Sequence, residues 1–141
     1  MIILDTDHFS VLKYDDSPQG ALLRARMAAS PDQDFAVTAI TLDEQLRGWM
    51  AKIAGSLDEA KQVGAYRRLV ELVRFFAAWK ILAFDEDAAA RSQALRKTRP
   101  RMGSMDRKIA AISLARDVLL LTANKRHFES VPGLRFEDWL H

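Results

Sequence analysis

Short apolar segments alternate with longer amphipathic segments along the chain. The apolar segments cover residues 2–5, 35–38, 80–84 and 118–122, with a last short one at 135–136. Their length and composition are typical of strands. The segment 118–122 (VLLLT) is apolar almost throughout, as expected of a strand that is buried on both faces of a parallel sheet.

The segments between these runs have helical spacing. Leu69, Leu72 and Phe76, for example, recur at intervals of three and four residues. Ser17 precedes a proline, which is typical of a helix start, and Asp85 is expected to cap a later helix. The predicted helices are one that contains Phe9, Leu12 and Tyr14, and those at residues 18–29, 41–55, 58–79, 86–97 and 104–116.

Alternating strands and helices predict an α/β fold with a mainly parallel sheet and helices on both sides. The chain has 141 residues and no linker-like segment, so we expect one domain, residues 1–141. In a sheet of this kind, ligands bind beside the carboxyl ends of the strands. Candidate functional residues are therefore expected at that edge.

Composition narrows the range of functions. Cysteine is absent, which excludes disulfides, thiolate metal ligands and a cysteine nucleophile. No apolar run is long enough to cross a membrane and no secretory signal is evident, so we expect a cytoplasmic protein with no membrane partner. The formal net charge is only +2, but basic residues cluster between positions 91 and 108. This cluster is either a phosphate-binding surface or an ordinary solvated helix face.

Four oxygen-bearing side chains are predicted to meet at the carboxyl edge of the sheet. Asp5 ends the first strand, and Glu44 lies in the first turn of the helix after the second strand. Asp106 lies in the first turn of the last long helix, and Asn124 follows the strongest predicted strand. Because strand ends and the helix starts after them share one edge of a parallel sheet, these groups can converge.

Several of these side chains also have a structural interpretation. Thr41 and Glu44 have the spacing of a capping box, in which Glu44 would bond only to the N-cap backbone. Asp106 would favour the positive end of a helix dipole, and Asp7 would cap a helix that begins at residue 8. His127, near the same strand end, is interpreted as structural.

Asp5 has no evident capping role, and a carboxylate at the edge of a core is costly without a partner. Several carboxylates with few other polar groups suit Mg²⁺ or Mn²⁺, hard cations that prefer oxygen ligands and retain several waters. Such an ion lowers the pKa of a bound water and offsets charge on a phosphate during in-line displacement. The residues therefore predict a divalent-metal site, with basic side chains nearby for a polyanionic substrate.

The segments that carry these residues resemble those of the PIN-domain ribonucleases, particularly the VapC toxins of bacterial toxin–antitoxin pairs. They are LDTD near the start, TLDEQLRGW, MGSMDRKIAAISLARD and LLLTANKRHFESVPGL. Their order and spacing agree with the family over nearly the whole chain. The resemblance implies a PIN-like three-layer α/β/α sandwich with a short, mainly parallel sheet.

The resemblance also implies a site and an activity. The family's acidic positions fall on Asp5, Glu44 and Asp106, which would bind Mg²⁺ or Mn²⁺, and its fourth position falls on Asn124, where many members carry Asp. These four residues would be catalytic in an endoribonuclease that cleaves phosphodiester bonds with a metal-activated water. Six further candidates for substrate contacts are Thr6, Thr122, Arg99, Arg101, Arg107 and Lys108.

Partners follow from the same resemblance: an RNA substrate, a cognate VapB-like antitoxin and a second copy of the chain in a homodimer. Two alternatives remain at this point. One is a non-catalytic module of the same fold that binds RNA or a partner, which the amide at Asn124 keeps open. The other is a phosphatase of the haloacid-dehalogenase type, in which Asp5 would be the nucleophile and Asp7 the acid.

Overall fold

A five-stranded sheet lies at the centre of the computed structural model, which describes residues 1–13 and 17–141. The strand order is β3-β2-β1-β4-β5, and every neighbouring pair is parallel. The strands are Ile2–Leu4 (β1), Phe35–Thr38 (β2), Lys80–Leu82 (β3), Leu119–Leu121 (β4) and Phe136–Glu137 (β5). The predicted strands are all present, although β1, β3 and β4 are shorter than expected because their flanking residues already turn toward helices or loops.

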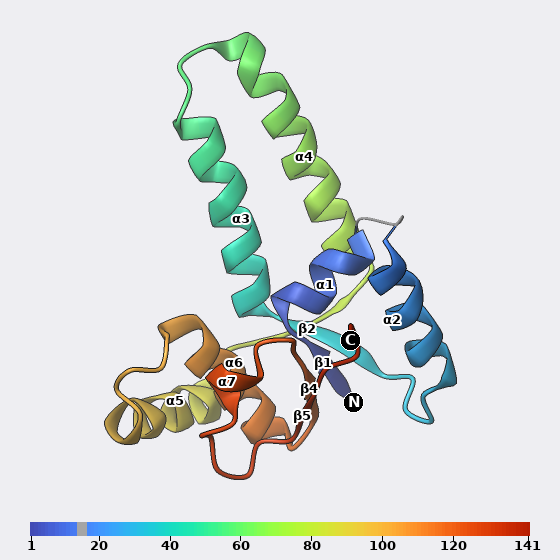
Figure 1. The fold of residues 1–141 in the computed structure, drawn as a ribbon. Coiled ribbons are helices and arrows are strands. Elements are labelled where there is room, and N and C mark those ends of the chain that lie inside the picture. The colour runs from blue at the N-terminus through green and yellow to red at the C-terminus, as the bar shows by residue number, and fades with distance from the viewer. Residues whose placement is uncertain (14–16) are drawn as a thin grey trace.

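Helices cover both faces of the sheet (Figure 1). On one side lie Thr6–Lys13 (α1), Pro18–Ala29 (α2), Ala39–Ala54 (α3) and Glu59–Ala77 (α4). On the other side lie Glu86–Thr98 (α5) and Ser104–Arg116 (α6), and the short helix Lys125–Phe128 (α7) follows β4. The predicted three-layer α/β/α arrangement is confirmed.

The alternation of side chains along each strand divides the core into two layers. Leu4 of β1 belongs to a buried cluster with Phe9 of α1 and Leu72 of α4. The preceding residue of β1, Ile3, belongs instead to a cluster with Ile109 of α6 on the other face. Strand residues that are apolar at every position therefore supply both layers, as expected of a parallel sheet.

Local capping explains where several helices begin. The side chain of Ser17 accepts the N–H of Gly20 at the start of α2, and Oδ1 of Asp85 accepts the N–H of Ala88 at 2.9 Å at the start of α5. Both caps agree with the prediction from sequence. Asp58 caps α4 in the same way, accepting the N–H of a residue in its first turn. Each side chain satisfies an N–H that has no partner inside the helix.

The predicted start of α3 was wrong. The helix begins at Ala39, and its N-cap is Thr38, whose hydroxyl accepts the N–H of Thr41 at 3.2 Å. There is therefore no capping box between Thr41 and Glu44, and Glu44 lies in the second turn rather than the first. The end of β2 provides the cap because Thr38 combines extended backbone with a hydroxyl at the right position.

Helices α1 and α7 also differ from the prediction. Helix α1 begins at Thr6, so Asp7 is inside the helix and does not cap it. Helix α7 was not predicted, because four residues are too few to show a periodic pattern. Tyr14, which was assigned to the first helix, lies outside the described residues.

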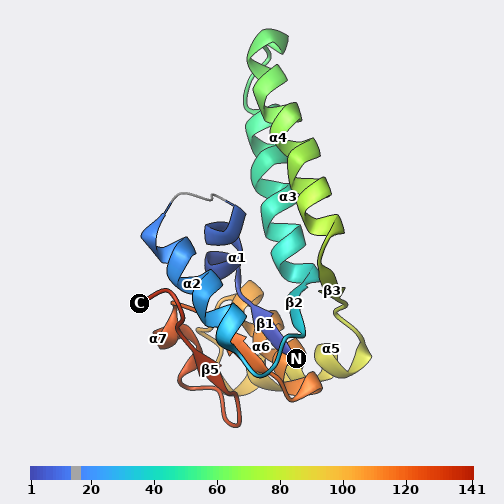
Figure 2. The same ribbon diagram turned by 90° about the vertical axis from the view of Figure 1, so that its right-hand side faces the viewer.

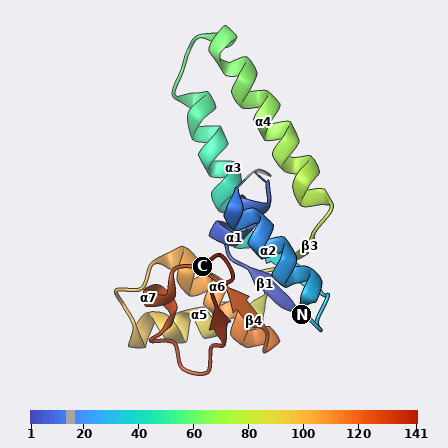
Figure 3. The same cartoon turned by 45° about the vertical axis from the view of Figure 1, so that its right-hand side comes forward.

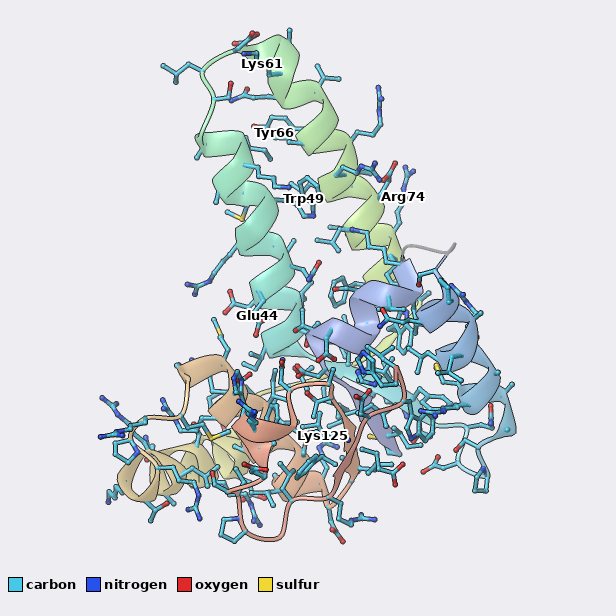
Figure 4. All side chains as sticks on the ribbon, viewed as in Figure 1. Glu44, Trp49, Lys61, Tyr66, Arg74 and Lys125 are labelled. Atoms are coloured by element: carbon cyan, nitrogen blue, oxygen red, sulfur yellow. The ribbon has the colours of Figure 1, made fainter. Side chains whose placement is uncertain are left out.

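Helices α3 and α4 form a hairpin that projects from the rest of the molecule, as Figures 1 and 2 both show. On α4, Leu72 and Phe76 of the predicted periodic face are buried, whereas Val70 and Val73 are about half exposed. Trp49 of α3 lies in the space between the two helices, with Nζ of Lys52 4.3 Å from its ring centroid (Figure 4). Among the described helices, none combines the length and apolarity needed to cross a membrane.

The C-terminal segment returns to α2, beside which Figure 3 shows the chain end. Nη1 of Arg26 donates to the backbone carbonyls of Asp138 and His141, both at 3.2 Å. The buried imidazole of His8 accepts the N–H of Trp139 at 3.0 Å through Nε2. These bonds fix the last residues against the two helices that follow β1.

Candidate active site

Asp5 lies at the carboxyl end of the central strand and is almost completely buried, with 4% of its surface exposed. Its Oδ1 accepts the N–H of Thr6 at 2.8 Å, and its Oδ2 accepts the hydroxyl of Thr122 at 2.8 Å. Thr122 directly follows β4, and β4 is the parallel neighbour of β1. The register of two adjacent strands therefore brings Asp5 and Thr122 together, and Asp5 has a local role at the start of α1 that was not expected from the sequence.

Burial makes the Asp5 carboxylate difficult to ionise. Loss of hydration raises the pKa of Asp5 from 3.8 to about 7, and the neighbouring charge of Asp7 adds to this effect. The hydrogen bonds from Thr122 and Thr6 oppose the rise, and the charge of Asp106 contributes a smaller increase in pKa. A carboxyl group with such a pKa, at the edge of a sheet, is typical of functional sites.

Glu44 reaches the same region from the second turn of α3. Its Oε2 accepts the hydroxyl of Thr6 at 3.1 Å, and the hydroxyl of Thr41 lies 3.2 Å from that of Thr6. Figure 4 shows Glu44 at the base of the projecting hairpin, above the layer that contains α7. Burial raises the pKa of Glu44, and the charge of Asp106 raises it further. Thr6 thus connects two carboxylates: its backbone N–H binds Asp5 and its hydroxyl binds Glu44.

Asp106 completes the acidic group from the first turn of α6. Its charge raises the pKa of both Asp5 and Glu44. Oδ2 of Asp106 lies 2.7 Å from Nδ1 of His127. Within the described part of the chain, no three acidic or histidine side chains stand close enough together to form a ready-made set of metal ligands.

Asn124 is linked to this group through its backbone. Its N–H donates to the hydroxyl of Thr122 at 3.1 Å, and that hydroxyl donates to Asp5. The side chain of Asn124 is exposed and does not cap α7. The backbone therefore supports the carboxylate of Asp5, and the amide side chain remains available on the surface.

The hydroxyls of the two predicted substrate-binding threonines are hydrogen-bonded to carboxylates of the site. The Thr122 side chain is fully buried and its hydroxyl donates to Asp5, so its contact with substrate stays a prediction. The hydroxyl of Thr6 is used by Glu44 and Thr41. Both residues hold carboxylates in position, which explains why hydroxyls follow the strand ends here.

The four predicted basic contacts divide into two pairs. Arg99 and Arg101 line a cavity of about 590 Å³ that also has Asp106 in its wall. Arg107 and Lys108 line a separate cavity of about 200 Å³. Within the second cavity, Nε of Arg107 donates to the Ser92 hydroxyl at 3.3 Å, which connects α6 to α5. Only the first pair shares a cavity with one of the carboxylates, that of Asp106.

Sequence reasoning did not consider Arg126 and interpreted His127 as structural. Arg126 and His127 line the same cavity as Asp106, and the His127 contact to Asp106 gives that histidine a place beside the carboxylates. Both lie on α7, whose direction is set by tertiary packing. The available signal was their spacing of two and three residues after Asn124, on a turn that follows a strand end.

Both carboxylate oxygens of Asp7 make contacts within the fold. Its Oδ2 accepts the N–H of Ala123 at 2.9 Å, and its Oδ1 lies 2.7 Å from Nδ1 of the buried His8. Asp7 therefore joins α1 to the segment after β4. With both oxygens occupied in this way, Asp7 is poorly placed to act as the general acid that a haloacid-dehalogenase-type phosphatase requires.

Comparison with known proteins agrees with the fold. The PIN domain family matches residues 2–134. The chain is 31% identical over 108 residues to a tRNA(fMet)-specific endonuclease VapC from Salmonella typhimurium, covering 73% of this chain and 74% of the relative. It is 36% identical over 78 residues to the protein of the same name from Shigella flexneri, covering 52% of this chain and 58% of that relative.

Solved structures show the same relationship. The DNA-bound VapBC of Salmonella typhimurium superposes with a TM-score of 0.75 and 25% identity, covering 98% of this chain and 97% of that chain. FitAcB of Neisseria gonorrhoeae superposes with a TM-score of 0.70 and 25% identity, covering 100% and 99%. The chain therefore belongs to the PIN-domain family and is of the VapC type, as its sequence motifs predicted.

Proposed function

We propose that this chain is a Mg²⁺- or Mn²⁺-dependent endoribonuclease and the toxin component of a toxin–antitoxin pair. Two curated relatives are named tRNA(fMet)-specific endonucleases, which supports a nuclease. The observation that carries the proposal is the electrostatic coupling of Asp5, Glu44 and Asp106 at the carboxyl edge of the sheet. The charge of Asp106 disfavours ionisation of Asp5 and of Glu44, and a cation at the same place would favour their charged forms.

The residues fit a hard divalent cation. The donors are carboxylate and amide oxygens, which Mg²⁺ and Mn²⁺ prefer over nitrogen or sulfur. Mg²⁺ retains several waters and needs only one or two direct carboxylates, so a preformed cage of three protein ligands is not required. Asp5 and Asp106 would hold the ion, with Glu44 and Asn124 binding its waters. When bound, the ion would lower the pKa of a water molecule and offset negative charge on the phosphate.

The chain's own residues position this chemistry. Thr122 and the N–H of Thr6 each donate to one oxygen of Asp5, so its carboxylate plane is fixed while further lone pairs remain free. Thr6 orients Glu44 through its hydroxyl. Arg101 lies in the wall of the cavity that contains Asp106, where its charge attracts the phosphate backbone of RNA.

The proposed partners follow from the relatives. Several similar solved structures are VapBC complexes, so we propose a VapB-like antitoxin as the partner of this chain and RNA in the cytoplasm as its target. We also propose a homodimer. The half-exposed Val70 and Val73 on the projecting hairpin offer apolar surface for one of these contacts.

The test is cleavage of total tRNA by the purified chain with Mg²⁺ or Mn²⁺, compared with the same reaction in EDTA. Asp106→Asn should remove metal-dependent cleavage, whereas Asp87→Asn, on the exposed surface of α5, should retain it. If the wild-type chain binds tRNA but leaves it intact under every metal condition, the non-catalytic alternative is correct and the proposal fails.

A further inference from the structure

A buried histidine lies between the candidate active site and the C-terminal segment. The side chain of His8, on α1, is completely buried. Its Nδ1 lies 2.7 Å from Oδ1 of Asp7, and its Nε2 lies 3.0 Å from the backbone nitrogen of Trp139. Both ring nitrogens are therefore bound, one on the side of the site and one on the side of the chain end.

The bond to Trp139 determines which ring nitrogen carries the proton. A backbone N–H can only donate, so Nε2 of His8 must be the unprotonated acceptor. The proton of the neutral imidazole then lies on Nδ1 and is donated to Asp7. Oδ1 of Asp138 is 3.8 Å from Nε2, beyond hydrogen-bond distance, and accepts the N–H of Leu140 at 2.8 Å. The chain end therefore sets the tautomer of His8.

Asp7 extends this connection to the segment after β4. Its Oδ1 accepts both the imidazole proton and the backbone N–H of His8, and its Oδ2 accepts the N–H of Ala123 at 2.9 Å. Asn124 follows directly, and its N–H donates to the hydroxyl that binds Asp5. A shift of the Asp7 carboxylate would therefore move the backbone that supports the acidic group.

We propose that His8 is a positioning residue of the proposed cleavage site. The N–H of Trp139 keeps the imidazole proton on Nδ1, this proton orients Asp7, and Asp7 holds the backbone at Ala123 beside the carboxylates. Mutation of groups that orient metal ligands typically lowers activity about 10- to 100-fold, and His8 lies behind such groups, so we expect a loss of roughly tenfold. The inference rests on the proposed nuclease function and adds a buried residue that supports the site.

The tautomer is measured on the wild-type chain, without metal or RNA. Long-range ¹H–¹⁵N NMR of the full chain, with ¹⁵N-labelled histidine in EDTA at pH 7.5, distinguishes protonated from unprotonated ring nitrogens. The signals of His8 are those that a His8 variant lacks. We expect a proton on Nδ1 and none on Nε2.

Two substitutions separate the two hydrogen bonds of His8. The amide nitrogen of an asparagine is one bond from Cγ, as Nδ1 is, so His8→Asn keeps a donor for Asp7 but loses the acceptor for Trp139. The amide oxygen of a glutamine is two bonds from Cγ, as Nε2 is, so His8→Gln keeps the acceptor but loses the donor. His141→Gln is the matched control, because it removes an exposed histidine that binds Asp138 in the same C-terminal segment.

Amide hydrogen exchange and cleavage should respond in opposite ways to the two variants. In His8→Gln, exchange at Ala123 should become about fivefold faster or more, as for the loss of one hydrogen bond, while the Trp139 amide stays protected. In His8→Asn the Trp139 amide should exchange faster and Ala123 should stay protected. With Mg²⁺ or Mn²⁺ and total tRNA, kcat should fall roughly tenfold in His8→Gln with KM unchanged, and should stay near the wild-type value in His8→Asn and His141→Gln.

Three results would overturn the inference: a proton on Nε2 of His8 in the wild type, equal exchange at Ala123 in the two His8 variants, or equal kcat in those variants. Urea unfolding checks that each variant is folded, because a purely structural histidine would lower stability without this difference in kcat. If His8→Gln does not fold, the wild-type tautomer and the exchange pattern of His8→Asn decide. A wild-type chain that cleaves no RNA with added metal would defeat the proposed function instead, because the tautomer and exchange measurements do not depend on cleavage.

Discussion

Replacing Asp5 with asparagine should stabilise the metal-free protein at pH 8. In the folded chain the pKa of Asp5 is about 7, compared with 3.8 for the ordinary carboxyl group. Above pH 7 the folded protein must therefore hold a charge that the unfolded chain accommodates in water. The asparagine side chain of the variant would occupy nearly the same volume without that charge.

The magnitude follows from the two pKa values. They differ by about 3, and one pKa unit corresponds to about 1.4 kcal/mol, so ionisation of Asp5 destabilises the fold by at most ~4 kcal/mol. The folded state binds more protons than the unfolded state between pH 4 and pH 7. The contribution of Asp5 to the free energy of unfolding of the wild type therefore falls as pH rises from 4 to 7, and it stays low above pH 7. The asparagine amide must form a different hydrogen bond with Thr122, which offsets part of this effect. We therefore expect the free energy of unfolding at pH 8 to rise by about 2–4 kcal/mol.

The assay is urea unfolding of wild type and Asp5→Asn in EDTA at pH 4, 6 and 8, with free energies from linear extrapolation. The advantage of the variant should be absent at pH 4, intermediate at pH 6 and full at pH 8. Asp87→Asn, which removes a surface carboxylate paired with Arg91, should show no such trend. An Asp5→Asn chain that is equally or less stable than wild type at pH 8 would refute the argument that this carboxylate is destabilised by burial.

Three other predictions concern the site and its support. Mn²⁺ at 100 times its Kd should raise the free energy of unfolding of the wild type at pH 8 by about 2.7 kcal/mol. The same Mn²⁺ concentration should not stabilise Asp5→Asn. Equal shifts of the urea midpoint in the two proteins would mean that the ion binds elsewhere. Thr122→Val removes the buried donor to Asp5, so it should cost about 1–3 kcal/mol at pH 8 by urea unfolding and less at pH 5. Asp85→Ala removes the cap of α5 and should cost about 1 kcal/mol in thermal unfolding while RNA cleavage stays at the wild-type rate.

The parts of the fold that depend on local pattern were predictable. Strands of three or four apolar residues and helices with side-chain caps such as Asp85 carry their own signal, and their alternation determines a parallel sheet. The meeting of Asp5 with Thr122 follows from this, because strand ends in a parallel register share an edge. The start of α3 was misplaced because two threonines, Thr38 and Thr41, were both plausible caps and only the end of β2 decides between them.

The parts of the site that depend on packing were not predictable. The cavity lining from Arg126 and His127 depends on the direction of a four-residue helix, which tertiary contacts fix. The bond from Thr122 to Asp5 was not foreseen, because sequence shows a hydroxyl near the site but not which way it points. Arg99 and Arg107 look alike in sequence, yet they line different cavities.

The hydrogen bond between Asp5 and Thr122 joins residues 117 positions apart. During synthesis, Asp5 cannot form this bond until Thr122 has been added. A ribosome-bound chain that ends before residue 122 therefore lacks this part of the site. Long-range closure of this kind is slow compared with helix formation. Any activity that needs the bond between Asp5 and Thr122 would therefore begin only after residue 122 has been synthesised.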